Sequence, residues 1–207
     1  MLKIGDNIDA FWRSLSDVGR KQLPFAVAMA LNDTAEDVAK AEEQSLEKSL
    51  DRPTPYTKRG IYRLRASKSR LRAEIGVKRV QEQYLRYQVD GGVRKPKGRA
   101  IVIPVGQRRN QYGNMPKGAV RKAAAKADTF VASRNDPRTK HLRPGIYQRP
   151  KRGRRGSAGQ AKLLVAFASA ASYNKRWDFK KGAEKKARSV FPQHLGTRWR
   201  QALATAK

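Results

Sequence analysis

The sequence has 207 residues, and its 47 Lys and Arg residues outnumber its 17 Asp and Glu residues, which gives a formal net charge of +30. This length suffices for one substantial domain or two small ones. The absence of cysteine excludes disulfides, thiolate metal sites and cysteine nucleophiles. The most apolar late stretch, KLLVAFASAA, is too short to span a bilayer, and we expect a soluble, unprocessed protein that binds no membrane.

The positive charge is unevenly distributed along the chain. The first 51 residues hold 6 basic and 10 acidic residues, whereas residues 52–207 hold 41 and 7. Such an excess is normally balanced by a polyanion or by an acidic protein partner. Three Trp, six Phe and seven Tyr residues, together with clear periodic segments, argue against disorder. We therefore expect a folded core that carries basic loops.

Apolar residues at helical spacing predict two N-terminal helices. Residues 5–21 carry apolar side chains three and four positions apart, and residues 23–50 are rich in Ala, Glu and Leu, with Pro24 suited to a first helical turn. Asp33 and Glu36 resemble a capping box, which would interrupt the second helix, but one continuous helix is the preferred interpretation. The apolar stripe is expected in the core or between subunits. The candidate subunit-interface residues are Trp12, Val27, Leu31, Val38 and Leu46.

The segment RPTPY (52–56) is predicted to end the helical region, because each proline lacks a backbone donor and restricts the residue before it. It separates an N-terminal helical region, 1–51, from a basic α+β region, 52–207, and we expect the two to form a single domain together. Beyond the junction, alternating apolar residues in LRAEIGVK predict a half-buried strand. GIYRLRAS is predicted as its partner strand, with a turn at residues 67–70.

Further short apolar runs predict more strands in the basic region. AIVIPV (100–105) and TFVAS (129–133) are two of them. Residues 145–149 and 161–169 are predicted to form an antiparallel pair. The stretch QRPKRGRRGSAGQ (148–160) would then be the tip of a hairpin, which would present its positive charges at a fixed place.

The remaining elements are predicted to be loops and helices. Residues 107–143 are loop-like apart from MPKGAVRKAAAKA, a local helix with Asn114 as its cap. The chain after Trp177 predicts a helix pair, or one helix kinked at Pro192. This order predicts an α+β fold with N-terminal helices (one long), an antiparallel β-meander with basic loop insertions, and a C-terminal helix packed on the sheet.

The sequence offers little support for an enzyme. His141 and His194 have no acidic or second histidine neighbour at ligand spacing, so a structural role is favoured for both. The seven carboxylates after residue 52 are scattered, which disfavours a metal-dependent nuclease. GRRGSAG lacks the GK[ST] of a phosphate-binding loop. We therefore expect no catalytic residues, no metal ion and no cofactor.

Sequence-independent contact with nucleic acid is better supported. Between Arg94 and Lys162 there are twenty Lys and Arg residues against two acidic residues, interleaved with aromatic side chains. No motif for base readout is visible. The alternative interpretation of the basic loops is that they are solvated and only make the protein more soluble. The candidate residues for contact with DNA or an acidic partner are Arg94, Lys95, Lys97, Arg99, Arg108, Arg109, Arg149, Lys151, Arg152, Arg154 and Arg155.

Several short segments follow one another in a characteristic order: LPFAVAMALNDTA, DRPTPYTKRGIY, YLRYQVDGG with AIVIP, NQYGNMPKGAV, GIYQR with KLLVAFAS, and RWDFKKGAEKKARSVFP. This order resembles a family of tailed-bacteriophage neck or tail-completion proteins related to the minor tail protein Z group. The resemblance covers nearly the whole chain from about Leu23 onward. It places Gly91 and Gly92 in a turn, and Asp178 and Phe179 at the start of the last helix.

The resemblance implies a small α+β subunit without catalytic residues. Such a subunit would assemble into a homo-oligomeric ring at the head–tail junction or upper tail, around the DNA channel. Its implied partners are neighbouring connector, tail-terminator or tail-tube proteins and, without sequence preference, double-stranded DNA. The implied location is the virion, and the host cytoplasm during assembly. The alternative, based on charge alone, is a nucleoid-like or RNA-binding protein that binds nucleic acid without sequence preference.

Overall fold

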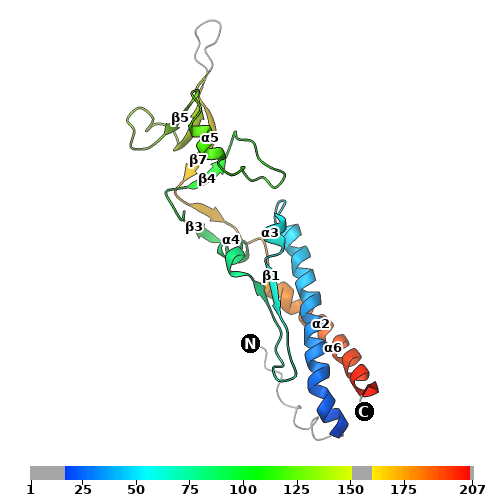
Figure 1. The fold of residues 1–207 in the computed structure, drawn as a ribbon. Coiled ribbons are helices and arrows are strands. Elements are labelled where there is room, and N and C mark those ends of the chain that lie inside the picture. The colour runs from blue at the N-terminus through cyan, green and yellow to red at the C-terminus, as the bar shows by residue number, and fades with distance from the viewer. Residues whose placement is uncertain (1–16, 151–159, 206–207) are drawn as a thin grey trace. The chain divides into compact units, whose positions relative to one another are not determined.

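The computed structural model describes residues 17–150 and 160–205 (Figure 1). The chain forms two compact units. Unit 1 comprises Met1–Leu50, Pro55–Leu85 and Trp177–Lys207, and unit 2 comprises Asp51–Thr54 and Arg86–Arg176. The predicted boundary at residue 51 therefore differs from the structural division, because the C-terminal segment returns to pack on the N-terminal helix.

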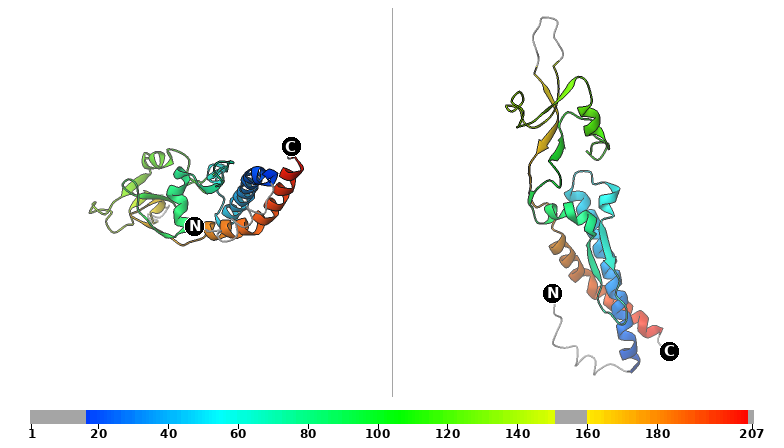
Figure 2. Two further views of the ribbon diagram at one scale, coloured as in Figure 1. Left: turned by 90° about the horizontal axis from the view of Figure 1, so that it is seen from below. Right: turned by 60° about the vertical axis from the view of Figure 1, so that its left-hand side comes forward.

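Two long helices form the main body of unit 1. Helix α2 (Asp17–Ser49) is continuous, as predicted for residues 23–50, but it begins before Pro24, so that proline lies inside the helix and not in its first turn. Helix α6 (Phe179–Ala204) is a single helix with Pro192 inside it and Asp178 as its N-terminal cap residue. The two helices run side by side (Figures 1 and 2). The packing of α6 is therefore chiefly along α2.

The polar residues in the middle of α2 do not interrupt it, because each has a hydrogen-bond partner. The Asn32 amide donates to Ala66 O (3.1 Å) and its oxygen accepts from Ala66 N–H (2.8 Å). The Thr34 hydroxyl donates to Ala30 O (2.8 Å), one turn earlier. Asp33 binds Arg198 of α6. These residue types favour helix ends when they lack such partners.

The apolar stripe of α2 forms part of the core of unit 1. Val38 and Leu46 are 0% exposed, so the prediction that they form a subunit interface is wrong. They are covered within the same chain, where α2 packs against α6 and against a β-ribbon. Val27 and Leu31 are half-buried and remain candidates for a subunit contact. Trp12, with most of the helix predicted over residues 5–21, lies outside the described residues.

The ribbon on α2 consists of strands β1 (Ile61–Leu64) and β2 (Glu74–Val77). They pair antiparallel from Ile61↔Val77 to Leu64↔Glu74, which confirms the predicted strand pair. The predicted turn is also present, since the backbones of Ser67 and Arg70 exchange two hydrogen bonds of 2.9 and 3.1 Å.

The sequence interpretation missed two helices. Helix α2 ends at Ser49, before RPTPY, as predicted, but a new helix, α3 (Pro55–Lys58), one turn long, begins at the second proline of that segment. A proline is compatible with a first helical position because the amide there needs no helical acceptor. Helix α4 (Arg79–Val89) follows β2, and its buried Gln81 donates from Nε2 to Tyr56 O (3.2 Å), which links the two helices.

Unit 2 is built on a four-stranded antiparallel sheet with the order β4-β7-β6-β5. The strands are β4 (Ile101–Pro104), β5 (Thr129–Ala132), β6 (Gly145–Gln148) and β7 (Lys162–Ala168), as the apolar runs predicted. Helix α5 (Ala119–Ala124) contributes Ala123 to a core that also contains Ile146, Leu164 and Val165. The predicted cap is wrong, because α5 begins after Gly118, whose φ is 78°.

A second pairing extends this sheet into a long irregular ribbon. Strand β3 (Gly92–Arg94) pairs antiparallel with β8 (Ala171–Tyr173). Arg94 faces Ala171 and Ile101 faces Ala168, so residues 95–100 lie opposite only residues 169–170. The segment KPKGRA is therefore a basic bulge in an otherwise paired ribbon. Gly91, just before β3, and Gly92, its first residue, have φ of 73° and 108°, values that favour glycine.

The predicted fold class is confirmed. The protein is α+β, with one long N-terminal helix, antiparallel strands in small sheets joined by basic loops, and a packed C-terminal helix.

Candidate nucleic-acid interface

Most of the net charge belongs to unit 2. Its residues include 24 Lys and Arg against 4 Asp and Glu, a formal charge of +20, and unit 1 accounts for the remaining +10. The boundary at residue 51 between acidic and basic sequence therefore does not coincide with the division between the units, because part of the basic sequence belongs to unit 1.

Five acidic residues of α2 are paired with side chains of unit 1. Their partners come from the part of the sequence that is rich in basic residues: Glu36 and Glu43 bind Arg63 (2.7 and 3.5 Å), Glu47 binds Lys58 (2.6 Å), Asp33 binds Arg198 and Asp37 binds His194. Most of these groups are partly exposed, so each pair contributes little to stability. Because these carboxylates are paired within unit 1, they do not offset the positive charge of unit 2.

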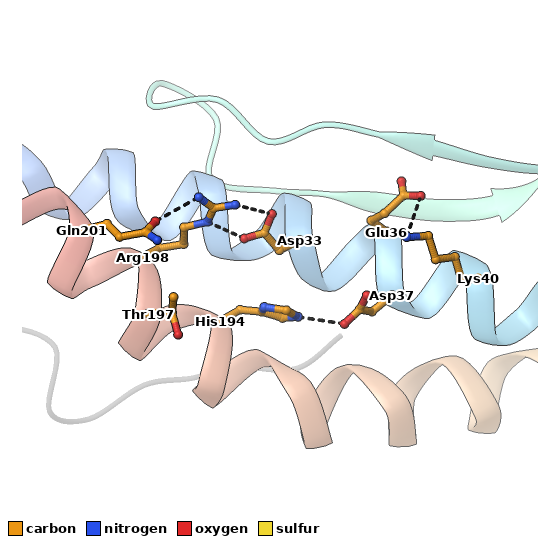
Figure 3. Close-up of a pocket in the computed structure, with 8 residues that line it drawn as sticks. All are labelled: Asp33, Glu36, Asp37, Lys40, His194, Thr197, Arg198 and Gln201. Carbon is orange, nitrogen blue, oxygen red and sulfur yellow. Dashed lines mark hydrogen bonds and ion pairs between the residues drawn. The ribbon is translucent and has the colours of Figure 1, made fainter.

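A polar cluster lies between α2 and α6 (Figure 3). Arg198 Nε donates to Asp33 Oδ2 at 2.5 Å and Nη2 donates to Asp33 Oδ1 at 2.9 Å, a bidentate pair. Arg198 Nη1 donates to Gln201 Oε1 at 3.0 Å. The hydrogen bond from Arg198 holds the pKa of Asp33 below its usual value, and desolvation opposes this only in part. The cluster borders a hollow of about 380 Å³.

His194 in this cluster pairs across the helices with a carboxylate of α2, a partner that lies far away in the sequence. Its Nε2 lies 3.0 Å from Asp37 Oδ2. Thr197, one turn further along the same helix, is exposed and has no hydrogen bond to the imidazole. Within residues 17–150 and 160–205, no three His, Cys, Asp or Glu side chains converge on a common metal position. The cluster clamps two helices together.

Asp33→Asn is expected to lower the free energy of unfolding by about 1 kcal/mol at pH 7, because the charge-assisted bidentate pair is lost. The pKa of Asp33 is lowered in the folded state, so its stabilisation is present above the unfolded pKa and disappears as the pH falls through the folded pKa. The free energies of unfolding of variant and wild type should therefore converge at low pH, and urea denaturation of both between pH 7 and about pH 2 measures this.

Glu184→Gln provides the control for this prediction. Glu184 also pairs with an arginine, Arg188, at 2.6 Å, but both side chains are more than half exposed. We expect this variant to differ from wild type by less than about 0.5 kcal/mol at any pH. Equal losses for the two variants would contradict the assignment of a helix clamp to Asp33.

The predicted contact residues occupy three described segments of unit 2. Arg94 ends β3 and is half-buried. Lys95, Lys97 and Arg99 are exposed in the basic bulge, and Arg108 and Arg109 are exposed after β4. Arg109 Nη2 donates to Pro104 O at 2.6 Å. Arg149 is exposed immediately after β6. The other four belong to the predicted hairpin tip and lie outside the described residues: Lys151, Arg152, Arg154 and Arg155.

The strand register divides these segments between the two ends of the sheet. Ile101 pairs with Ala168, so the basic bulge lies beyond the end where β7 finishes. Pro104 pairs with Val165 and Gln148 pairs with Lys162, so the exits of β4 and β6 lie at the end where β7 begins. Arg108, Arg109 and Arg149 follow these exits. The structure therefore does not bring all the predicted residues to one place.

The structure adds two residues to the candidate contacts: Arg138, which the sequence interpretation did not single out, and His141, for which it favoured a structural role. Arg138 and His141, from the loop between β5 and β6, line one groove with Arg149. Sequence reasoning treated this region as an undifferentiated loop, and the only local signal is the turn-forming NDP at residues 135–137. That signal indicates a turn but not the position of the side chains beside Arg149.

No helix in the described part of the chain combines the length and the apolar character needed to cross a membrane. Comparison with known proteins gives no match among family models, curated proteins or solved structures.

Proposed function

We propose that this chain is a non-enzymatic structural protein of a tailed-phage virion, a neck or tail-completion subunit that forms a ring at the head–tail junction or upper tail around the DNA channel. The observation that carries the proposal is the charge of unit 2, a formal +20 with basic residues exposed at both ends of its sheet. Repeated around a ring, this charge would attract the DNA that passes through it or acidic neighbouring proteins.

The ion pairs and the apolar residues of helix α2 in unit 1 support the same proposal. Five acidic side chains of this helix bind basic side chains of the same unit, so these five do not offset the charge of unit 2. Val27 and Leu31 of α2 are half-buried, and we propose them as contacts between neighbouring copies. The proposed protein partners are connector, tail-terminator or tail-tube proteins.

Localisation in purified particles tests this proposal. A version of the chain with a label at its C-terminus should appear by electron microscopy at the head–tail junction or upper tail, and deletion of its gene should leave heads and tails that fail to join. A label on the capsid surface or at the distal tail would contradict the proposal.

A second candidate is a free protein that binds nucleic acid without sequence preference. The exposed basic residues in the described part of unit 2 favour it equally. It predicts that the label follows nucleic acid in the infected cell and is missing from purified particles.

A further inference from the structure

A groove of about 710 Å³ in unit 2 combines basic and apolar side chains and has no carboxylate in its lining. It lies between the loop 133–144 and the adjoining ends of β6 and β7. We propose that it binds a phosphate group of a nucleic-acid backbone; this rests on the proposed function and names a site for it. The lining of the groove includes Phe130, Arg138, His141, Leu142, Arg149 and Gln160.

The first wall of the groove is a loop that is fixed by its own hydrogen bonds. The buried Thr139 hydroxyl donates to Ser133 O (3.2 Å) and accepts from Ser133 N–H (3.1 Å), which closes the loop on itself. Asp136 Oδ1 accepts from Arg138 N–H (3.0 Å). The backbone that carries Arg138 is therefore held in position, which reduces the entropy cost of using its side chain to bind a ligand.

The second wall is fixed by strand pairing and ring stacking. Arg149 N–H donates to Asp128 O (2.7 Å), which extends the β5–β6 ladder by one bond. The Arg149 guanidinium carbon lies 5.4 Å from the centre of the Phe130 ring, and Phe130 stacks on Tyr147 with centroids 5.6 Å apart. The Tyr147 hydroxyl donates to Arg143 O (3.0 Å), which ties this stack to the loop of the first wall.

The two arginines have no acidic partner among the residues that the structure describes. The nearest carboxylates along the chain are already engaged: Asp128 Oδ2 accepts from Gln148 Nε2 (2.8 Å), and Asp136 accepts from the backbone of Arg138. Two guanidinium groups thus lie on one groove without internal neutralisation, and an anion from outside would supply it.

A backbone phosphate fits this groove better than a carboxylate does. The oxygens of a phosphate point in tetrahedral directions and can accept from guanidinium groups on separate segments, whereas the two oxygens of a carboxylate lie in one plane and match a single guanidinium fork best. Arg138 and Arg149 come from different segments, the loop 133–144 and the end of β6, and His141 and Gln160 add further donors to the lining. Phe130 and Leu142 add apolar surface beside these groups. The sugar of a nucleic-acid backbone can pack on such a surface, whereas a free phosphate ion has no apolar part to do so.

The test compares variants of the full-length chain in their binding to a labelled DNA duplex, by fluorescence anisotropy over a series of KCl concentrations. Arg138→Gln/Arg149→Gln removes both groove arginines. Arg121→Gln/Lys122→Gln removes two exposed basic residues of α5 that do not line the groove, with the same change in charge. Arg138→Lys/Arg149→Lys keeps the charge and removes the guanidinium groups. Circular-dichroism melting verifies that each variant folds.

We expect the Gln groove variant to weaken binding about tenfold at low salt and to reduce the slope of log K against log[KCl] by about 1, the value for one lost phosphate contact. The matched control should lose less than about threefold in DNA affinity, because it loses the same net charge as the Gln groove variant but no groove contact. The Lys groove variant should also bind more weakly than wild type. Equal losses in the groove and control variants, or no DNA binding by the wild-type chain, would overturn the proposal.

Two further measurements distinguish other sources of the anion. If poly-glutamate binds as tightly as DNA and shows the same loss in the groove variant, the groove belongs to an acidic protein and the proposal fails. Tight calorimetric binding of inorganic phosphate, with DNA binding unaffected by the groove variant, would assign it to the free ion and also overturn the proposal. None of these results depends on where the protein lies in the particle, so failure of the groove and failure of the proposed function are separate outcomes.

Discussion

Replacing Trp177 with alanine is expected to lower the free energy of unfolding by about 3–5 kcal/mol, the range for truncating a buried aromatic side chain. Trp177 is 0% exposed, and its ring packs edge-on against Phe179 with centroids 5.0 Å apart. Its indole Nε1 donates to Glu42 Oε2 at 3.0 Å, which joins the start of the C-terminal helical segment to α2. Urea denaturation followed by far-ultraviolet circular dichroism measures the loss.

The loss has two components, and a second variant separates them. Trp177→Phe retains an aromatic ring but removes the N–H donor, which leaves the Glu42 carboxylate without its indole partner, at an expected cost of about 1–3 kcal/mol. Burial already raises the pKa of Glu42, and the nearby Asp178 carboxylate adds to this effect. Leu203→Ala, at an exposed position of α6, is the control and should cost less than about 1 kcal/mol. A loss at Trp177 no larger than at Leu203 would contradict the core position.

Elements with a local signal were predictable from the sequence. The long helix follows from its Ala, Glu and Leu content, and the β6–β7 pair follows from two apolar runs separated by a glycine-rich stretch. Helix α4 was missed because tertiary contacts support it: its Gln81 binds the backbone of α3, and Tyr84 Oη lies 3.1 Å from the Thr57 hydroxyl. A segment such as YLRYQV does not reveal these partners.

The sequence shows how many charged residues there are, but it does not show which of them pair with one another. The sequence separates an acidic N-terminal region from a basic remainder, yet Arg63 and Arg198 lie 27 and 165 residues from the acids they bind. Glu42 follows Ala41 within a charged segment and has no sign of burial in the sequence, because its partner Trp177 is 135 residues away. The groove arginines line the same groove because β5 pairs with β6, which the sequence around each arginine does not indicate. Contacts at such separations depend on the fold and not on local pattern.

Gly182→Ala is expected to lower the free energy of unfolding by about 1–3 kcal/mol, although alanine is the better helix former. A Cβ atom at Gly182 would overlap Glu42 Oε1. Glu42 is 3% exposed and holds the Trp177 indole, so its carboxylate cannot move aside without breaking that hydrogen bond. Urea denaturation of the variant and the wild type measures the difference.

Gly196→Ala is the matched control, because Gly196 lies in the same helix and a methyl group added there would have no atom within 4 Å among its non-local neighbours. There we expect the opposite sign, a gain of up to about 1 kcal/mol from helix propensity and reduced entropy of the unfolded chain. In a Glu42→Ala background the overlap is absent, so Gly182→Ala should become stabilising as well, since contacting residues couple in a double-mutant cycle. If Gly182→Ala stabilises the wild-type chain as much as Gly196→Ala does, α6 does not pack closely on Glu42, and the carboxylate does not link Trp177 to α2 as described.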